Sequence, residues 1–267
     1  MSELASRRRE LLQVGEARID VIVDGEGEGE TIVLLPSSLR DSEDFDLLAD
    51  LLAVEGFQVL RPQPRGMGRS SPPPPGMTLE TLANDVAGVI AQLASGPAVV
   101  VGHAYGHWIA RITDLRHPQH VRGVVVLGAA ARQFPRGMAE AMAIASDPLR
   151  PEEERLAALR RCMFAPDSDP RVWLQGWHPQ WRAAYREAGQ QPPKDVWFPH
   201  ANAPILDLQG AQDAWRPPAT RRELAEVLGA RVTVEEIAHA GHALVPEQPH
   251  AVARAIADWV RRLDNPH

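Results

Sequence analysis

Residues 99–108 read Val-Val-Val-Gly-His-Ala-Tyr-Gly-His-Trp, and this stretch decides the fold. The apolar run Ala98 to Val101 is typical of a buried strand, and a helical pattern follows the second glycine. Gly102 and Gly106 take the glycine positions of Gly-x-Ser-x-Gly, the sharp strand-to-helix turn called a nucleophile elbow. The central position, where a serine, cysteine or aspartate attacks a substrate, holds Ala104. A methyl group cannot attack a carbonyl, so the stretch predicts the geometry for acyl chemistry without its nucleophile.

The composition indicates one globular α/β domain with an insertion, because the chain has 267 residues and 44 % of them are apolar. The net charge is −7 and no long basic block occurs, so we expect no nucleic-acid partner. The single cysteine, Cys162, excludes an intrachain disulfide and fits a cytoplasmic location. No run of about 18 apolar residues occurs, so we expect neither a transmembrane helix nor a membrane partner.

An early arginine run, Ser6-Arg7-Arg8-Arg9, is faintly similar to a twin-arginine export signal. An export signal continues with an apolar core, whereas here Glu16, Arg18 and Asp20 follow. We therefore expect no signal peptide in this run.

Short apolar runs alternate with helical patterns along the chain. We expect strands at residues 18–23, 31–36, 58–61, 98–102, 121–127, 205–209 and 231–237. We expect helices near residues 44–53, 78–94, 105–117, 218–228 and 249–263, with Asp44 and Thr78 as N-caps. Several strands are rich in Val, Ile and Leu without alternation, which is typical of parallel strands buried on both faces. The alternation predicts an α/β fold with a mostly parallel central sheet flanked by helices.

Residues 132–200 break this alternation, because they contain no convincing strand and several prolines interrupt their helical patterns. The segment follows the strand that ends near Leu127. We interpret it as a helical lid inserted into a core made of residues 1–131 and 201–267.

Aromatic residues recur in the expected lid at every fourth position: Trp173, Trp177, Trp181 and Tyr185. This spacing places them on one helix face, although Pro179 falls within the run. They either pack the lid onto the body or form an aromatic wall for an apolar substrate.

Four motifs follow one another in an order that points to a known family. They are Leu-Pro-Ser-Ser-Leu-Arg at 35–40, Arg-Pro-Gln-Pro-Arg-Gly-Met-Gly-Arg-Ser at 61–70, the elbow, and the pair Gln-Gly-Ala-Gln-Asp at 209–213 with Ala-Gly-His at 240–242, the latter followed by Pro-Glu-Gln-Pro at 246–249. With them the chain resembles the α/β-hydrolase superfamily over nearly its whole length outside the lid. The elbow and the arginine-rich turn are similar to those of a bacterial subgroup with alanine at the elbow.

The resemblance implies a chain order of nucleophile, acid and histidine, which position 104, Asp213 and His242 follow. A carboxylate on one imidazole nitrogen fixes the tautomer and leaves the other nitrogen as a base. We therefore expect Asp213 and His242 to be hydrogen-bonded catalytic partners. His239 is a rival base, but it precedes the Ala-Gly of the motif.

The first loop departs from the family pattern, because Pro36-Ser37 stands where the family often has His-Gly. An oxyanion hole needs two backbone N–H groups, and proline has none. Ser37 or Ser38 supplies one donor in this interpretation, and Tyr105 supplies the second.

Further side chains are candidates for substrate contact: His103 beside the elbow, Trp177 and Trp181 in the lid, and Arg40 for a substrate carboxylate, with a solvated arginine as the alternative. His107 also flanks the elbow and stands four residues from His103, but no third ligand is evident. We expect no metal and no cofactor.

Ala104 leaves three accounts open. In the first account the alanine is natural, and a His–Asp dyad activates water or runs cofactor-free lyase or oxygenase chemistry. In the second it replaces the serine of a hydrolase that was disarmed by engineering. In the third the chain is a pseudoenzyme that binds a small molecule without catalysis. A nucleophile from Ser37 or Ser38 is a further possibility. The prediction is an enzyme, as a monomer or homodimer, that acts on a small apolar or aromatic carbonyl compound of the ester or lactone class.

Overall fold

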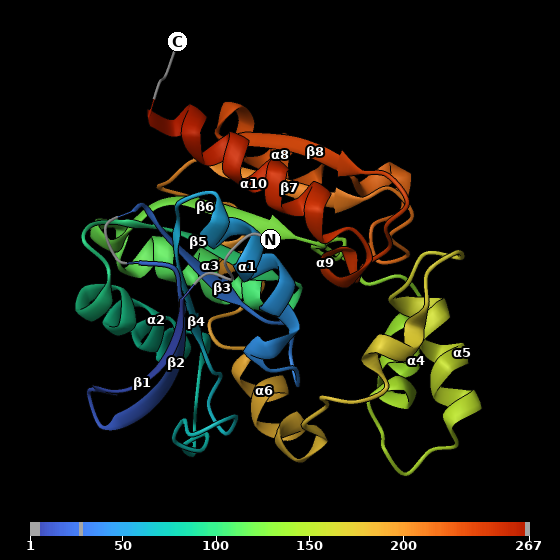
Figure 1. Ribbon diagram of the computed structural model, residues 1–267. Helices are drawn as coiled ribbons and strands as arrows, with labels where there is room; N and C mark the ends of the chain where they lie inside the picture. The colour runs from blue at the N-terminus through green and yellow to red at the C-terminus, as the bar shows by residue number, and fades with distance from the viewer. Residues whose placement is uncertain (1–5, 27–28, 265–267) are drawn as a thin grey trace.

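The computed structural model of the protein describes residues 6–26 and 29–264. Within these ranges eight strands form one sheet in the order β1-β2-β4-β3-β5-β6-β7-β8 (Figure 1). The strands are β1 (Arg7–Val14), β2 (Ala17–Asp24), β3 (Thr31–Leu35), β4 (Gln58–Pro62), β5 (Ala98–His103), β6 (Val121–Leu127), β7 (Ile205–Gly210) and β8 (Val232–Ile237). The pairs from β4 to β8 are parallel, and β2 pairs antiparallel with both β1 and β4. The α/β fold and all seven predicted strands are confirmed.

Strand β1 is the element that the sequence analysis missed. Its residues are mostly exposed, since it lies at the sheet edge, and its three arginines hide the strand pattern. A two-residue turn at Gly15 and Glu16 joins it to β2, and Gly15 has a φ of 55°. Such a positive φ is the reason for glycine in this tight hairpin turn.

Helices cover both faces of the sheet, as predicted (Figure 1). On one face α2 (Leu79–Leu93) packs against α3 (Tyr105–Arg116), and on the other α1 (Asp46–Val54) packs against α10 (Pro249–Asp264). Val100 of β5 belongs to the hydrophobic core on the face of α2 and α3, whereas its neighbours Val99 and Val101 belong to the core on the face of α1 and α10. Successive strand side chains point to opposite faces, so a strand between two helical layers needs the continuous apolar run that the sequence shows.

One of the two predicted N-caps is present. The hydroxyl of Thr78 accepts a hydrogen bond from the Thr81 amide, and the Thr81 hydroxyl accepts one from the Thr78 amide. Asp44 as an N-cap is wrong, because it lies inside a 3-10 turn, Ser42–Phe45, and its carboxylate pairs with Arg40.

Between β6 and β7 the chain forms only helices and 3-10 turns. The helices are α4 (Met138–Ala145), α5 (Glu152–Cys162), α6 (Arg182–Ala188) and α7 (Lys194–Trp197), and the 3-10 turns are Pro170–Trp173 and Pro179–Trp181. In Figure 1, α4 and α5 form a lobe beside the sheet. The predicted aromatic stripe on one helix is wrong, because Trp173, Trp181 and Tyr185 lie in three different elements. The proline at 179 starts a new turn there.

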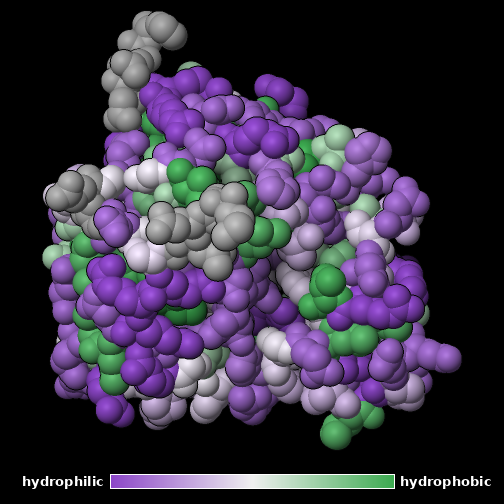
Figure 2. Space-filling view, in the orientation of Figure 1, coloured by the Kyte–Doolittle hydropathy of each residue, from purple (hydrophilic) through white to green (hydrophobic). Residues whose placement is uncertain are grey.

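Beyond β7, α8 (Glu223–Leu228) follows a 3-10 turn, Pro218–Thr220, and α9 (Leu244–Glu247) precedes α10. Polar residues cover most of the face of the molecule in Figure 2. Among residues 6–26 and 29–264, no helix is long and apolar enough to cross a membrane.

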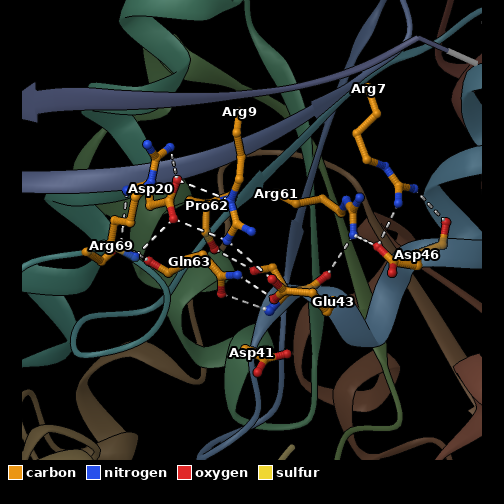
Figure 3. A network of polar contacts seen from close by, with 12 residues as sticks. Arg7, Arg9, Asp20, Asp41, Glu43, Asp46, Arg61, Pro62, Gln63 and Arg69 are labelled. Carbon is orange, nitrogen blue, oxygen red and sulfur yellow. Dashed lines mark hydrogen bonds and ion pairs between the residues drawn. The ribbon is translucent and has the colours of Figure 1, made fainter.

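Arg7 and Arg9 of β1 pair with buried carboxylates of β2, and Figure 3 shows Arg9 beside Asp20. Asp24 is fully buried and accepts hydrogen bonds from Arg7 Nε at 2.5 Å and Arg61 Nε at 2.7 Å. Asp20 pairs with Arg9 and Arg69. Burial alone would raise the pKa of Asp20, but the hydrogen bonds from Arg69 and the charge of Arg9 lower it overall. Two arginines of the early run, Arg7 and Arg9, therefore neutralise buried carboxylates of the sheet.

Candidate active site

The elbow takes the strained shape that its glycines predict. Ala104 lies between β5 and α3 with φ 46° and ψ −114°, a conformation that costs about 1–3 kcal/mol in a non-glycine residue. A Cβ on Gly102 would lie 2.3 Å from the Gly106 backbone, and one on Gly106 would lie 2.3 Å from the Leu35 carbonyl oxygen. The Ala104 amide donates to the Leu127 carbonyl at 2.9 Å. Close packing of three backbone segments therefore forces the turn.

His242 and Asp213 meet as the chain order predicts. His242 lies between β8 and α9, Asp213 follows β7, and both are buried. His242 Nδ1 lies 3.0 Å from Asp213 Oδ2 and 3.2 Å from Oδ1, and the Trp215 amide donates to Oδ1 at 2.8 Å. Because the carboxylate accepts the proton on Nδ1, Nε2 of the neutral ring carries the free lone pair. This geometry matches that of a histidine base held by a carboxylate.

The rival base lies in the His242 loop, and a positioning residue that the sequence analysis missed lies in α9 just after it. His239 is exposed at a φ of 56°, whereas Asp213 and His242 are buried. Glu247 accepts hydrogen bonds from the amides of Gly241 and Ala165, each at 2.7 Å. Its carboxylate thus ties the His242 loop to the helical segment. The Pro-Glu-Gln-Pro motif contained this residue, but its spacing does not reveal the contact.

A cavity of about 500 Å³ opens at the elbow, within the size range of small-ligand sites. Ala104 and His242 line it together with Ser37, Ser38 and Tyr105, the residues predicted to build the oxyanion hole. Its remaining walls are largely apolar and include Trp108, Phe134, Met142 and Trp215. His242 and the elbow therefore face one largely apolar cavity.

Two histidines flank Ala104 in different ways. His103 Nε2 donates to the His242 carbonyl at 2.8 Å, and its ring packs 5.8 Å from that of Trp173. Burial lowers the pKa of His103 to about 3, so the ring is neutral. It lies outside the lining of the cavity in the described chain, and its contact with a substrate stays a prediction. His107 does line the cavity; its Nδ1 donates to the Ala104 carbonyl, and burial lowers its pKa well below the usual value.

The other side chains predicted to contact a substrate make contacts within the protein. Trp181 donates from Nε1 to the Gly66 carbonyl at 2.9 Å, and Trp177 donates to the Trp173 carbonyl at 2.6 Å. Neither belongs to the described lining of the cavity, and their contact with a substrate stays a prediction. Arg40 is buried, pairs with Asp44 and lies 4.8 Å from the ring centroids of Trp173 and Trp177. These contacts clamp the first loop to the helical segment, so the expected solvated arginine is wrong, and a contact with a substrate carboxylate stays a prediction.

The chain's single lysine, Lys194, lies beside the cavity wall. Its Nζ is 5.8 Å from the Trp108 ring centroid, 5.9 Å from that of Phe134 and 5.3 Å from that of Phe198. Desolvation by burial, and less so nearby arginines, lowers its pKa to about 8. The ammonium remains the main form at pH 7.

Chemical labelling tests this shift. Only the neutral amine attacks acetic anhydride, so acetylation of Lys194 in the folded protein is expected to reach half its maximal rate near pH 8. In urea the same peptide is expected to show a midpoint about 2 pH units higher. Peptide mass spectrometry measures both rates, and equal midpoints would rule out the lowered pKa.

Comparisons with known proteins show the family of this chain. The alpha/beta hydrolase family profile matches residues 32–255, and the chain belongs to this family. The mouse sn-1-specific diacylglycerol lipase ABHD11 is 23 % identical over 259 residues, which cover 90 % of this chain and 83 % of that protein. The zebrafish protein of the same name is 31 % identical over 107 residues, 40 % of this chain, and the match spans only 33 % of its length.

Solved structures show the same fold. A thermophilic esterase from Thermogutta terrifontis superposes with a TM-score of 0.76 at 22 % identity. The superposition covers 97 % of this chain and 99 % of the esterase chain. Cfl2 from Burkholderia cenocepacia has a TM-score of 0.73 at 25 % identity, with 97 % of each chain covered.

Proposed function

We propose that this protein hydrolyses a small ester-type compound, with His242 as the base that activates the attacking water. The observation that carries the proposal is the buried Asp213–His242 pair facing a cavity in which Ala104 holds the nucleophile position. The esterase and lipase names of its relatives favour this reaction class. The apolar walls of the cavity favour an apolar or aromatic body in the substrate.

The reaction balances with water as the only co-substrate. Water attacks the carbonyl carbon and gives its proton to His242 Nε2, while Asp213 stabilises the imidazolium. The tetrahedral oxyanion accepts hydrogen bonds from backbone N–H groups, which we assign to Ser37 or Ser38 and to Tyr105. Its collapse breaks the bond to the alcohol oxygen, which takes the proton from His242. The methyl group of Ala104 leaves the space in which the water sits.

A second candidate is an acyl-serine hydrolase whose serine is replaced at position 104. The strained φ and ψ of Ala104 favour it, because the backbone keeps the conformation that presents a nucleophile although the alanine side chain cannot attack. The two candidates differ in what a serine would add.

An ester and lactone panel separates them. In the water mechanism the unaltered chain hydrolyses p-nitrophenyl esters, and Ala104→Ser changes kcat/KM by less than about tenfold, because the base already has its nucleophile. In the second candidate the unaltered chain is inactive, and Ala104→Ser raises the rate by several orders of magnitude, since a missing nucleophile costs about 10⁶ in a serine protease. No His242-dependent hydrolysis by either form would contradict both candidates.

The segment between β6 and β7 is the part of the chain that the proposal treats as a lid. We propose that residues 132–200 act as a lid over a core of residues 1–131 and 201–267, because Phe134, Met142 and Tyr185 of this segment line the cavity. Membership of the alanine-elbow subgroup, a cytoplasmic location and a monomeric or homodimeric state stay predictions.

A further inference from the structure

The cavity has a charge pattern that the sequence analysis did not anticipate. Two arginines of α6, Arg182 and Arg186, line it one helical turn apart. Among the described residues that line the cavity there is no aspartate or glutamate. The lowered pKa of His107 keeps that lining histidine neutral. The chamber is thus positive in a protein whose net charge is −7.

Arg182 is held at the wall by one hydrogen bond. Its Nη2 donates to Ser146 Oγ at 2.8 Å, and Ser146 in turn donates to the Met142 carbonyl at 2.7 Å. Ser146 is fully buried at the end of α4, while Arg182 is half-buried. A guanidinium has five N–H donors, so four of them remain for another group.

Neither cavity arginine has an ion-pair partner in the described chain, whereas other arginines near the site do. Arg65 binds Asp85 through two hydrogen bonds at 2.7 and 2.8 Å, and Arg216 binds Asp207 at 2.9 Å. A half-buried guanidinium beside apolar walls attracts an anion strongly, because water screens it less than a surface charge. Of the two, Arg182 is the half-buried one, and it also borders a smaller neighbouring hollow with Asp147 and Arg150, neither of which is its ion-pair partner.

We propose that the substrate of this site carries an anionic group, a carboxylate or phosphate, that binds Arg182 while its apolar part lies against Trp108 and Phe134. The inference rests on the proposed hydrolysis at His242 for its reaction, but not for its binding. Arg186 is exposed and contributes attraction at the mouth of the cavity. The planar guanidinium fork suits both oxyanions, since each accepts two parallel N–H donors.

The kinetic test compares two esters of matched length. The mono-p-nitrophenyl ester of adipic acid carries a terminal carboxylate, and p-nitrophenyl hexanoate does not. Arg182→Gln is expected to lower kcat/KM for the anionic ester by about 10–100-fold, the value of a charge-assisted hydrogen bond, and that for the neutral ester less than twofold. The unchanged neutral rate also shows that the variant folds.

Matched arginine variants give the controls. Arg171→Gln changes an exposed arginine outside the described lining and is expected to leave both rates unchanged. Arg186→Gln is expected to lower the anionic rate only severalfold, with an effect that 0.5 M NaCl removes. Equal losses for both esters in Arg182→Gln would overturn the proposal.

A binding test separates this inference from the proposed function. Tryptophan fluorescence reports binding of hexanoate, hexyl phosphate and hexanol to the His242→Ala variant, because Trp108 and Trp215 line the cavity. We expect at least one anion to bind tenfold or more tightly than hexanol, and Arg182→Gln to remove the difference. The tighter anion identifies carboxylate or phosphate as the ligand group.

The outcomes of the two tests are distinct. Arg182-dependent anion binding without hydrolysis of any ester would support this site and contradict the proposed function. His242-dependent hydrolysis with no preference for anionic esters, and hexanol binding as tight as that of both anions, would overturn this inference alone.

Discussion

Replacing His242 by alanine is expected to lower kcat/KM for ester hydrolysis by about 10²–10⁴, the contribution of a positioned general base. Of the Asp213–His242 pair, His242 is the member that lines the cavity in the described chain. Its Nδ1 faces Asp213, so its Nε2 carries the lone pair that accepts the proton. Its loss leaves water without a proton acceptor, although the cavity and the oxyanion donors remain. Initial rates over a range of ester concentrations, with circular dichroism to confirm folding, measure the effect.

His239→Asn is the matched control for this variant. His239 lies three residues earlier in the same loop, is exposed and has a positive φ that asparagine tolerates. We expect it to keep full activity. A loss of activity in His239→Asn with none in His242→Ala would reverse the assignment of the base.

Replacing Gly106 by alanine is expected to destabilise the fold by about 3 kcal/mol, at the upper end of overpacking costs. The new Cβ would lie 2.3 Å from the Leu35 carbonyl oxygen and 2.7 Å from that of Pro36. Both are backbone atoms, so relief requires moving α3 or the loop that carries the oxyanion donors. In a domain of this size the melting temperature is expected to fall by roughly 6–12 °C, which differential scanning calorimetry measures.

Gly96→Ala is the control for the same chemical change. A Cβ on Gly96 meets no atom within 4 Å among the described residues, and the residue is exposed. We expect its melting temperature to stay within about 1 °C of the unaltered protein. If Gly106→Ala were equally harmless, the packing of the elbow against the first loop would be wrong.

Local patterns predict most of this fold because each strand between two helical layers must be continuously apolar. The run around Val100 shows this pattern, and the glycines at 102 and 106 mark where two backbones meet. Strand β1 escapes such reasoning because its Arg7 and Arg9 pair with buried carboxylates of another strand. That pairing is a tertiary contact, which periodicity along one segment does not contain.

The site follows the same division. Chain order and residue type predict the contact between Asp213 and His242, because the ends of parallel strands meet at one sheet edge. The walls of the cavity depend on how the irregular segment 132–200 folds. Trp177 and Trp181 were expected there and pack elsewhere, while Arg182 lines the cavity without a sequence signal.

The central claim is that water, and no side chain of this protein, attacks the ester. Intact-mass spectrometry of the unaltered chain during turnover of a p-nitrophenyl ester tests it most directly, with Ala104→Ser as the reference for a covalent acyl group. We predict many molecules of acid released per chain while the protein mass stays unchanged. An acyl adduct on the unaltered chain that forms and decays at the turnover rate, for example on Ser37 or Ser38, would contradict the account, and so would a chain that releases no acid at all.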